Sequence, residues 1–230
     1  RNTVVLGIES LVFSFPAPII LALLLNELHY ERFKKVVQTI SYMPYFLSVV
    51  IVVGMMKELF SMSDGPINAV MEAIGLQRHN FFMDPGSFRP LYIGSGIWQG
   101  VGYGSIIYLA AISGINPEMY ESAVLDGAGR IKQMWYITLP SILPTISILF
   151  IMAVAGVLGN DFQKILLMYS PRTYATADVI STYVYRYGIE TAGNNLSYSS
   201  AVGLLVNVVS LFFLLGANFV TGKLSETSLF

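Results

Sequence analysis

Four charged residues lie close together in the segment YESAVLDGAGRIKQMWYITLP, which runs between two long uncharged stretches. Charged side chains so spaced could bind a partner of opposite charge, and glycines between them would permit tight turns of the backbone. The chemistry that this spacing indicates is recognition of a partner. The residues concerned are Glu121, Asp126, Arg130 and Lys132, with Gly127 and Gly129 among them.

No pattern for catalysis or for a bound nucleotide accompanies these residues. The sequence has neither a Gly-x-x-x-x-Gly-Lys phosphate loop nor a Gly-x-Ser-x-Gly nucleophile motif. It has no cysteine, and His29 and His79 lie far apart without carboxylates at ligand spacing, which argues against a metal site. The net charge of −1 argues against a nucleic-acid partner. We therefore expect no cofactor and no metal in this chain.

The composition indicates an all-α polytopic membrane protein. Of the 230 residues, 54% are hydrophobic and 12% are charged, whereas soluble domains carry about 25% charged residues. A membrane-spanning helix needs about 20 mostly apolar residues. Five segments meet that requirement, namely Thr3–Asn26, Val36–Met56, Pro90–Ile115, Ile137–Gly159 and Ser200–Thr221.

The basic cluster of Arg32, Lys34 and Lys35 sets the predicted orientation, because short cytoplasmic loops are enriched in lysine and arginine. The loop Leu28–Gln38 that holds the cluster is therefore expected to be cytoplasmic. Alternation of the spans then predicts the sides of the other segments: 116–139 and the tail at Lys223 inside, and Phe60–Arg89 and Asn160–Ser199 outside.

Two short helices are predicted within the outer loops. The stretch Ser63–Gly75 has a turn signal followed by an amphipathic pattern. The stretch Thr176–Glu190 would place Val179, Tyr183 and Arg186 or Tyr187 on one helical face. We favour the interpretation that both are surface helices at the membrane interface over the alternative that they bind an external partner.

The charged segment itself is predicted to form an elbow, which we define as residues 116–139. Asn116 can cap a first helix, Pro117 suits its first position, and Gly127 suits a left-handed turn at its end, near Leu125. A second short helix would follow, with an apolar side, until Pro140 stops it. From the residues alone, the elbow is either an interfacial amphipathic anchor or a docking element.

The spacing in the elbow resembles a known motif. Glu-Ser-Ala at 121–123 is followed by three residues, Gly127, nine residues and Ile-Thr-Leu-Pro at 137–140. This resembles the EAA loop of permease subunits of ABC importers, with Ser122 in place of the usual alanine. FSFPAPIILALLLNE, RFKKVVQTISYMPYFLS and GSIIYLAAISGINPEMYESA resemble the branch that carries oligosaccharides and polysaccharide fragments.

The resemblance implies a type I ABC importer permease fold in a single domain, residues 1–230. Such subunits have six spans, so five are visible here and the chain is expected to be truncated at its N-terminus. The elbow would be the coupling helix, and the resemblance implies these docking residues for the ATPase: Glu121, Ser122, Ala123, Asp126 and Gly127.

The resemblance also implies partners and a location. These are a second homologous permease subunit, two cytoplasmic ATPase subunits that bind ATP and Mg, an extracytoplasmic solute-binding protein, and lipid of a bacterial cytoplasmic membrane. The permease itself would hold no cofactor and catalyse no reaction.

Polar residues within spans tend to face a bundle interior or a water-filled path. Gly96, Gly100 and Gly104 form a ridge of small residues that would let another helix approach. The polar and aromatic residues in or near the spans could line a sugar path, or they could fill space and make interhelical hydrogen bonds. These candidates are Trp98, Gln99, Tyr103, Asn160, Asp161 and Asn207.

Two functions from other classes fit the sequence less well than import driven by ATP. An ion-coupled secondary transporter for small polar solutes should carry ionisable groups at the bilayer midplane, and the predicted spans have almost none. An intramembrane enzyme would need a nucleophile with its base, or a metal site, and neither pattern is found.

Overall fold

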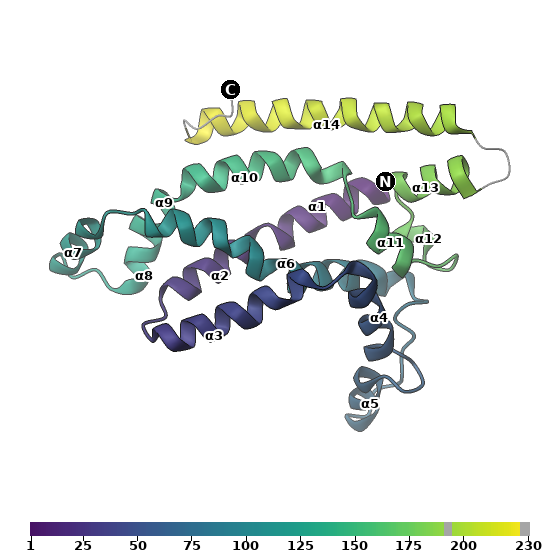
Figure 1. Ribbon diagram of the computed structural model, residues 1–230, viewed down its shortest axis with the longest axis horizontal. Helices are drawn as coiled ribbons and strands as arrows, with labels where there is room; N and C mark the ends of the chain where they lie inside the picture. Colours follow the sequence, from purple (N-terminus) through teal and green to yellow (C-terminus); the bar gives the residue numbers. More distant parts are fainter. Residues whose placement is uncertain (191–194, 226–230) are drawn as a thin grey trace. The chain divides into compact units, whose positions relative to one another are not determined.

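The structure is a computed structural model that describes residues 1–190 and 195–225. Within these ranges every regular element is helical (Figure 1). The chain divides into two compact units, each assembled from three stretches. Unit 1 contains Arg1–Ser10, Phe46–Gly96 and Gly156–Ser210, and unit 2 contains Leu11–Tyr45, Ile97–Ala155 and Leu211–Phe230.

The two ends of the described chain form its most apolar helices. α1 (Asn2–Ser14) and α2 (Pro16–Asn26) follow one another with a break only at Phe15, because Pro16 lacks an N–H and begins a new helix. Together they qualify as one span, and so does most of α14 (Leu196–Ser225). These confirm the first and last predicted spans.

The second predicted span is bent and begins earlier than expected. α3 (Glu31–Tyr42) and a short 3-10 turn at Met43–Phe46 are followed by α4 (Val49–Leu59), and the two parts of the pair meet at 101°. The extended backbone of Ser48 ends the first part, and its Oγ caps α4 by accepting the Ile51 N–H at 3.3 Å. The basic cluster therefore lies on a helix, where a loop had been predicted.

The fourth predicted span is bent as well, by 62°. Its first part contains α8 (Arg130–Gln133), a π turn at Met134–Thr138 and α9 (Leu139–Ser141), and its second part contains α10 (Leu143–Ala155) and a 3-10 turn at Gly156–Leu158. If each bent pair is one span, four helical segments are long and apolar enough to cross a membrane.

The third predicted span corresponds to α6 (Pro85–Ser113), which at 29 residues is the longest of the central helices. It does not reach the apolarity of the other four because glycine and polar residues recur along it. Its start is fixed by Asp84, which accepts the Ser87 N–H at 2.8 Å and the Ser87 hydroxyl at 2.6 Å. These hydrogen bonds lower the pKa of Asp84, and the bond from the Ser87 hydroxyl has the largest effect.

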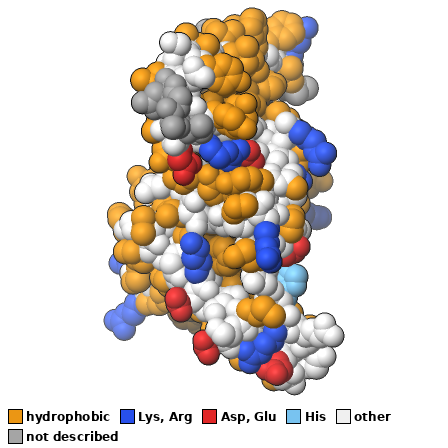
Figure 2. All heavy atoms as spheres, turned by 90° about the vertical axis from the view of Figure 1, so that its right-hand side faces the viewer, with side chains coloured by type: hydrophobic (Ala, Val, Ile, Leu, Met, Phe, Trp, Pro, Cys, Tyr) orange, Lys and Arg blue, Asp and Glu red, His pale blue; other side chains and the backbone are white. Residues whose placement is uncertain are grey.

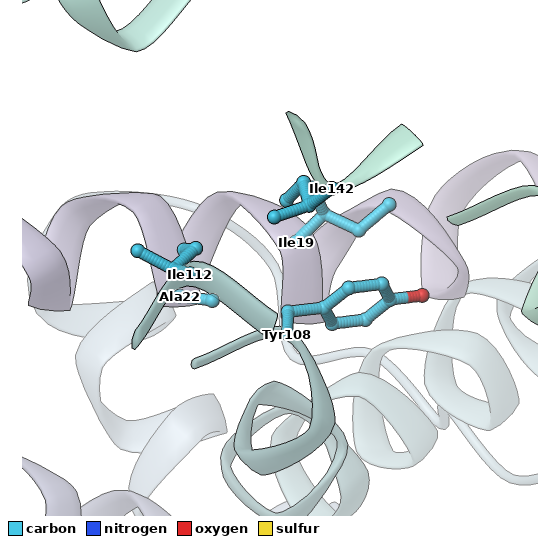
Figure 3. Packing of buried hydrophobic residues seen from close by; sticks show 5 residues of the cluster. All are labelled: Ile19, Ala22, Tyr108, Ile112 and Ile142. Carbon is cyan, nitrogen blue, oxygen red and sulfur yellow. The ribbon is translucent and has the colours of Figure 1, made fainter. Parts of the chain in front are cut away.

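The core of unit 2 is built from three segments distant in sequence. Ile19 and Ala22 of α2 pack against Tyr108 and Ile112 of α6, and Ile142 covers them at the bend before α10 (Figure 3). Ile142 is 1% exposed. Burying an aliphatic side chain of this size contributes about 1.5–3 kcal/mol, so the bend is anchored in the core of this unit.

Unit 1 contains the segments predicted to lie outside. α5 (Pro66–Ala73) confirms the first predicted surface helix. The second is divided into α12 (Tyr174–Ala177), α13 (Ile180–Tyr185) and a π turn at Arg186–Glu190, because extended backbone at Asp178 and Val179 interrupts the helix. The common face predicted from Val179 onward is therefore wrong at its first residue, which caps α13.

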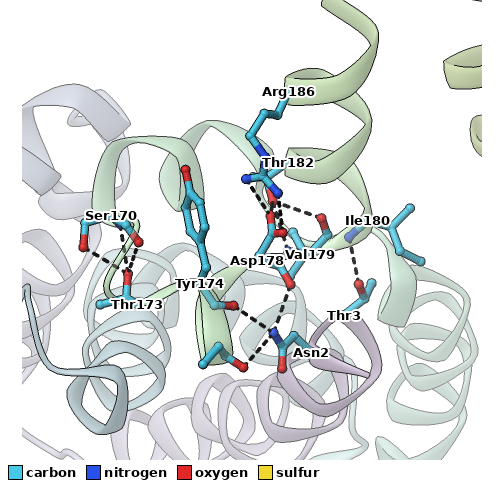
Figure 4. Close-up of polar contacts among 11 residues, drawn as sticks. Asn2, Thr3, Ser170, Thr173, Tyr174, Asp178, Val179, Ile180, Thr182 and Arg186 are labelled. Carbon is cyan, nitrogen blue, oxygen red and sulfur yellow. Dashed lines mark hydrogen bonds and ion pairs between the residues drawn. The ribbon is translucent and has the colours of Figure 1, made fainter. Parts of the chain in front are cut away.

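A polar cluster ties α1 to these outer segments (Figure 4). The Asn2 amide donates to the carbonyls of Tyr174, Ala175 and Asp178 at 3.0–3.3 Å. The Ile180 N–H donates to Thr3 Oγ1 at 2.9 Å. Arg186 pairs with Asp178 at 2.6 Å, which raises the pKa of Arg186. Segments predicted on the same side of the membrane thus contact one another.

Apolar side chains cover much of the surface on the face shown in Figure 2, with charged side chains between them. Leu204, Phe212 and Phe219 of α14 are each more than 60% exposed. Apolar patches of this kind are expected where a protein contacts lipid or another subunit. Residues 191–194 of the predicted outer loop, and the tail after 225, lie outside the described residues.

Candidate functional site: the elbow and the transport path

The first helix of the elbow begins and ends as the sequence predicts. α7 covers Pro117–Leu125, and the side chain of its N-cap, Asn116, accepts the Glu118 N–H at 3.0 Å. Glu118 lies in the first turn, where a carboxylate interacts favourably with the positive end of the helix dipole. The helix therefore needs no tertiary support to define its start.

Gly127 closes α7 with a left-handed turn, at φ +75°. The Gly127 N–H donates to the Val124 carbonyl at 3.0 Å, and the Ala128 N–H donates to the Ala123 carbonyl at 2.9 Å. This pair of bonds is the Schellman motif, which satisfies carbonyls at a helix end. A Cβ at Gly127 would meet no atom within 4 Å. Glycine is thus needed there for its backbone conformation and not for space.

The second half of the elbow differs from the prediction. α8 starts after Gly129, but the helix does not stop at Pro140, because the π turn at Met134–Thr138 precedes that residue. The Leu139 N–H donates to the carbonyl of Met134, five residues back. The wider π turn accommodates a proline, which has no N–H to donate. The bend follows at Ile142 instead.

Side-chain contacts hold the two halves together. Tyr120 Oη of α7 lies 2.9 Å from Thr138 Oγ1, which is almost completely buried. Gln133 Nε2 donates to the Ala128 carbonyl at 2.8 Å. Arg130 Nη1 lies 3.2 Å from Nδ1 of His29, in the other loop predicted to be cytoplasmic. This last contact confirms that the two loops lie on one side.

The elbow presents a charged and apolar surface, with exposed acidic side chains on α7 and exposed Arg130 and Lys132 on α8. Of the five predicted docking residues, Glu121, Ser122, Asp126 and Gly127 are exposed and Ala123 is half-buried. Large apolar side chains lie exposed on the same segment, among them Leu125 at 89%, Ile131 at 72% and Tyr136 at 79%. Apolar groups so exposed indicate a surface that another molecule covers. The role of the five residues stays a prediction.

Three of the path candidates belong to unit 2 and lie on α6. Trp98 and Tyr103 are both nearly half-exposed. The Tyr103 ring stacks on the ring of Tyr45, with centroids 3.8 Å apart and planes 5° apart. Gln99 lies between them in sequence and forms an interaction of its own. Tyr45 is not among the candidates predicted from the sequence, because the bend that follows it was not predicted.

The glycine ridge of α6 is only partly used as predicted. A Cβ at Gly104 would lie 3.0 Å from Pro18 of α2, so that pair confirms a close approach. Gly100 faces open space within 4 Å. The tightest approach on α6 is made by Gly102, where a Cβ would overlap the Ser41 carbonyl oxygen of α3. Gly102 is not on the predicted ridge, and helix spacing alone could not identify it.

Asn160 and Asp161, candidates in unit 1, use their polar groups within the fold. Asn160 Nδ2 donates to the Thr3 carbonyl at 3.1 Å. Asp161 caps α11 (Phe162–Met168) by accepting the Lys164 N–H at 3.0 Å, and its own N–H donates to Tyr92 Oη at 3.0 Å. The structure thus favours the structural interpretation for these two residues.

Lys164 of α11, which the sequence analysis did not single out, is 4% exposed. Its Nζ lies 5.2 Å from the centroid of the Tyr92 ring and 3.6 Å from the position that a Cβ would take at Gly96. Burial lowers the pKa of Lys164 to about 8, although the charge of Asp161 opposes that shift. The sequence did not indicate that Lys164 is buried, because this residue lies in a segment predicted to be an outer loop.

Asn207, the last path candidate, lines a pocket of about 400 Å³ in unit 1. Phe162, Ser181 and Tyr185 line the same pocket. Ser181 Oγ is buried there and has no hydrogen-bond partner. The surroundings of Asn207 are therefore mostly apolar, with few polar groups.

Glu9 of α1 forms an ion pair within unit 1. Arg89 Nη1 lies 3.4 Å from Glu9 Oε1, and both side chains are largely buried. Glu9 Oε2 and Arg89 Nε are buried without a hydrogen-bond partner. Within the described residues, no group of three or more histidine or acidic side chains could hold a metal ion.

The chain is similar to proteins of known kind. Protein LplB of Bacillus subtilis is 40% identical over 230 residues, which cover 100% of this chain and 72% of that protein. The polygalacturonan/rhamnogalacturonan transport system permease protein YteP of the same organism is 41% identical over 100% of this chain and 71% of that protein. A solved bacterial alginate ABC transporter, in complex with an alginate pentasaccharide-bound periplasmic protein, contains a chain that matches with a TM-score of 0.95 and 45% identity. The match covers 99% of this chain and 78% of that one.

The family match extends over nearly all of the helices described above. Residues 14–225 match the family described as "Binding-protein-dependent transport system inner membrane component". The match includes the elbow, α6 and α11, and it begins within α1. The chain belongs to the family of inner membrane components of binding-protein-dependent transport systems.

Proposed function

We propose that this chain imports oligosaccharides, as one permease subunit of an ATP-driven importer in the bacterial cytoplasmic membrane. Family membership establishes a membrane permease component that is not itself an enzyme. The substrate class is supported by similar proteins whose names specify polygalacturonan, rhamnogalacturonan and alginate. All three are polysaccharides, so fragments of polysaccharides are the substrates proposed here.

The observation that carries the proposal is the geometry of the elbow. α7 is capped at both ends by its own residues, closed by the left-handed turn at Gly127, and joined to the second half through Tyr120 and Thr138. A self-contained segment with an exposed charged and apolar surface can transmit force from a partner. We propose that a cytoplasmic ATPase subunit binds this surface through Glu121 and its neighbours.

The proposed assembly has three further subunits and a delivery protein. A second permease subunit would cover part of the exposed apolar surface, and two ATPase subunits would bind ATP and Mg. An extracytoplasmic binding protein would deliver sugar to the segments of unit 1. ATP binding would shift the population from an inward-facing to an outward-facing state, because closure of the ATPase dimer moves the elbow. An ion-coupled secondary transporter receives no support from the comparisons.

The test is reconstitution of the complete importer in vesicles, with uptake and ATP hydrolysis measured on a panel of oligosaccharides. We expect hydrolysis to be stimulated by binding protein loaded with an oligosaccharide, and the chain alone to hydrolyse no ATP. Gly127→Pro should leave insertion intact and uncouple hydrolysis from uptake, since proline cannot adopt φ +75° and cannot donate to Val124. Normal uptake by that variant would refute the coupling role.

A further inference from the structure

Lys164 is a buried cation whose ammonium has no partner of opposite charge. Four ion pairs occur in the part of the chain that the structure describes, and Lys164 is in none of them. No hydrogen-bond acceptor lies at its Nζ within the same residues, and the atom is not fully buried. Its carbon chain is therefore covered, while its ammonium retains a small accessible surface. Buried lysines are almost always paired.

The neighbours of Lys164 hold it in place and offset its charge only in part, through the Coulomb attraction of Asp161. The centroid of the Tyr92 ring lies 5.2 Å from the ammonium, and the other neighbour from α6 is Gly96, which has no side chain. Asp161 is the nearest acid in sequence, but its carboxylate oxygen accepts the Lys164 N–H and caps the helix. The Tyr92 hydroxyl accepts the Asp161 N–H and keeps its own proton to donate.

We propose that Lys164 binds the carboxylate of an acidic sugar, so that the substrates of this permease are oligosaccharides that contain uronic acids. This inference rests on the proposed function and narrows its substrate class. A carboxylate would supply the missing charge, and charge-assisted hydrogen bonds are about twice as strong as neutral ones. The similar alginate transporter is described as importing an acidic polysaccharide, which agrees with this chemistry.

The test compares two pentasaccharides of the same length in the reconstituted importer, oligogalacturonate and its fully methyl-esterified form. Esterification removes the negative charges and adds a methyl group to each carboxyl, while the chain length and the linkages stay the same. Lys164→Gln removes the cation, Lys164→Arg keeps it, and Lys57→Gln removes an exposed cation of α4 as the matched control. Uptake and the stimulation of ATP hydrolysis are measured for each, and assembly of each complex is checked by size exclusion.

We expect Lys164→Gln to lower uptake of oligogalacturonate at least tenfold and to leave uptake of the ester within a factor of two. Lys164→Arg and Lys57→Gln should keep the wild-type preference. Equal loss for both sugars would overturn the inference, because Lys164 would then serve the fold or a partner subunit. Equal uptake of both sugars by every variant would overturn it as well and leave the proposed function standing. A wild-type importer that transports the ester but not oligogalacturonate would also overturn the inference, and one that transports no oligosaccharide of the panel would refute the proposed function itself.

Discussion

Tyr120 Oη and Thr138 Oγ1 lie 2.9 Å apart and join the two halves of the elbow across eighteen residues of sequence. Thr138 is 2% exposed, whereas Tyr120 is half-buried. A hydrogen bond that closes a segment at a buried residue makes the segment move as one piece. Under the proposed function, such a segment would transmit force from a partner subunit into α10.

The Tyr120–Thr138 bond can be tested with a double-mutant cycle. Tyr120→Phe and Thr138→Val should each destabilise the protein by about 1 kcal/mol, the usual net contribution of one hydrogen bond. The double variant should cost less than the sum, because both changes remove the same bond. Thermal unfolding of the purified protein in detergent measures stability, and additive losses would show that the two hydroxyls do not interact.

Gly127 should be sensitive to substitution where Gly129 is not. Gly127→Ala forces a Cβ into the left-handed region and should cost about 1 kcal/mol. Gly129 has φ −69° and open space around it, so Gly129→Ala should change stability little. Coupled ATP hydrolysis in the assembled importer should fall for the first variant only. Equal activity of the two would contradict the requirement for a left-handed turn.

Two glycines of α6, two residues apart, should respond in opposite directions. An alanine at Gly102 would press against the Ser41 carbonyl oxygen, so Gly102→Ala should cost about 1–3 kcal/mol from overpacking. An alanine at Gly100 meets open space, so Gly100→Ala should gain up to about 1 kcal/mol from helix propensity. The melting temperatures of the two variants and of the wild type test this prediction. Destabilisation by both substitutions would mean that Gly100 is also a contact position.

The buried Lys164 predicts a dependence of stability on pH. Its pKa is about 8 in the folded chain, below the ordinary value of 10.5. Between these values the unfolded chain binds the proton and the folded chain does not, so stability rises as pH increases from 8 to 10.5. Below pH 8 the cost is on the order of 3 kcal/mol, at about 1.4 kcal/mol per pKa unit. Lys164→Met should therefore raise the melting temperature at pH 7 and remove this rise.

Local signals in the sequence were sufficient for the elbow and for the existence of the helices. Asn116, Pro117 and Gly127 act on the backbone within a few residues of themselves, so their effects follow from residue type and spacing. The five apolar segments predicted five helical regions. The alternation of spans predicted that the loops of His29 and Arg130 lie on the same side of the membrane, and these two residues contact each other in the structure.

Tertiary structure alone decided where the helices bend and which polar groups are already used. Pro140 has a strong tendency to end a helix, but the preceding π turn accommodates it and the break comes at Ile142, whose side chain is buried in the core of unit 2. Asn160 and Lys164 are both polar residues beside a span. Only the fold ties the first to the Thr3 carbonyl and leaves the second buried without a counter-charge, because those neighbours come from α1 and α6, distant in the sequence.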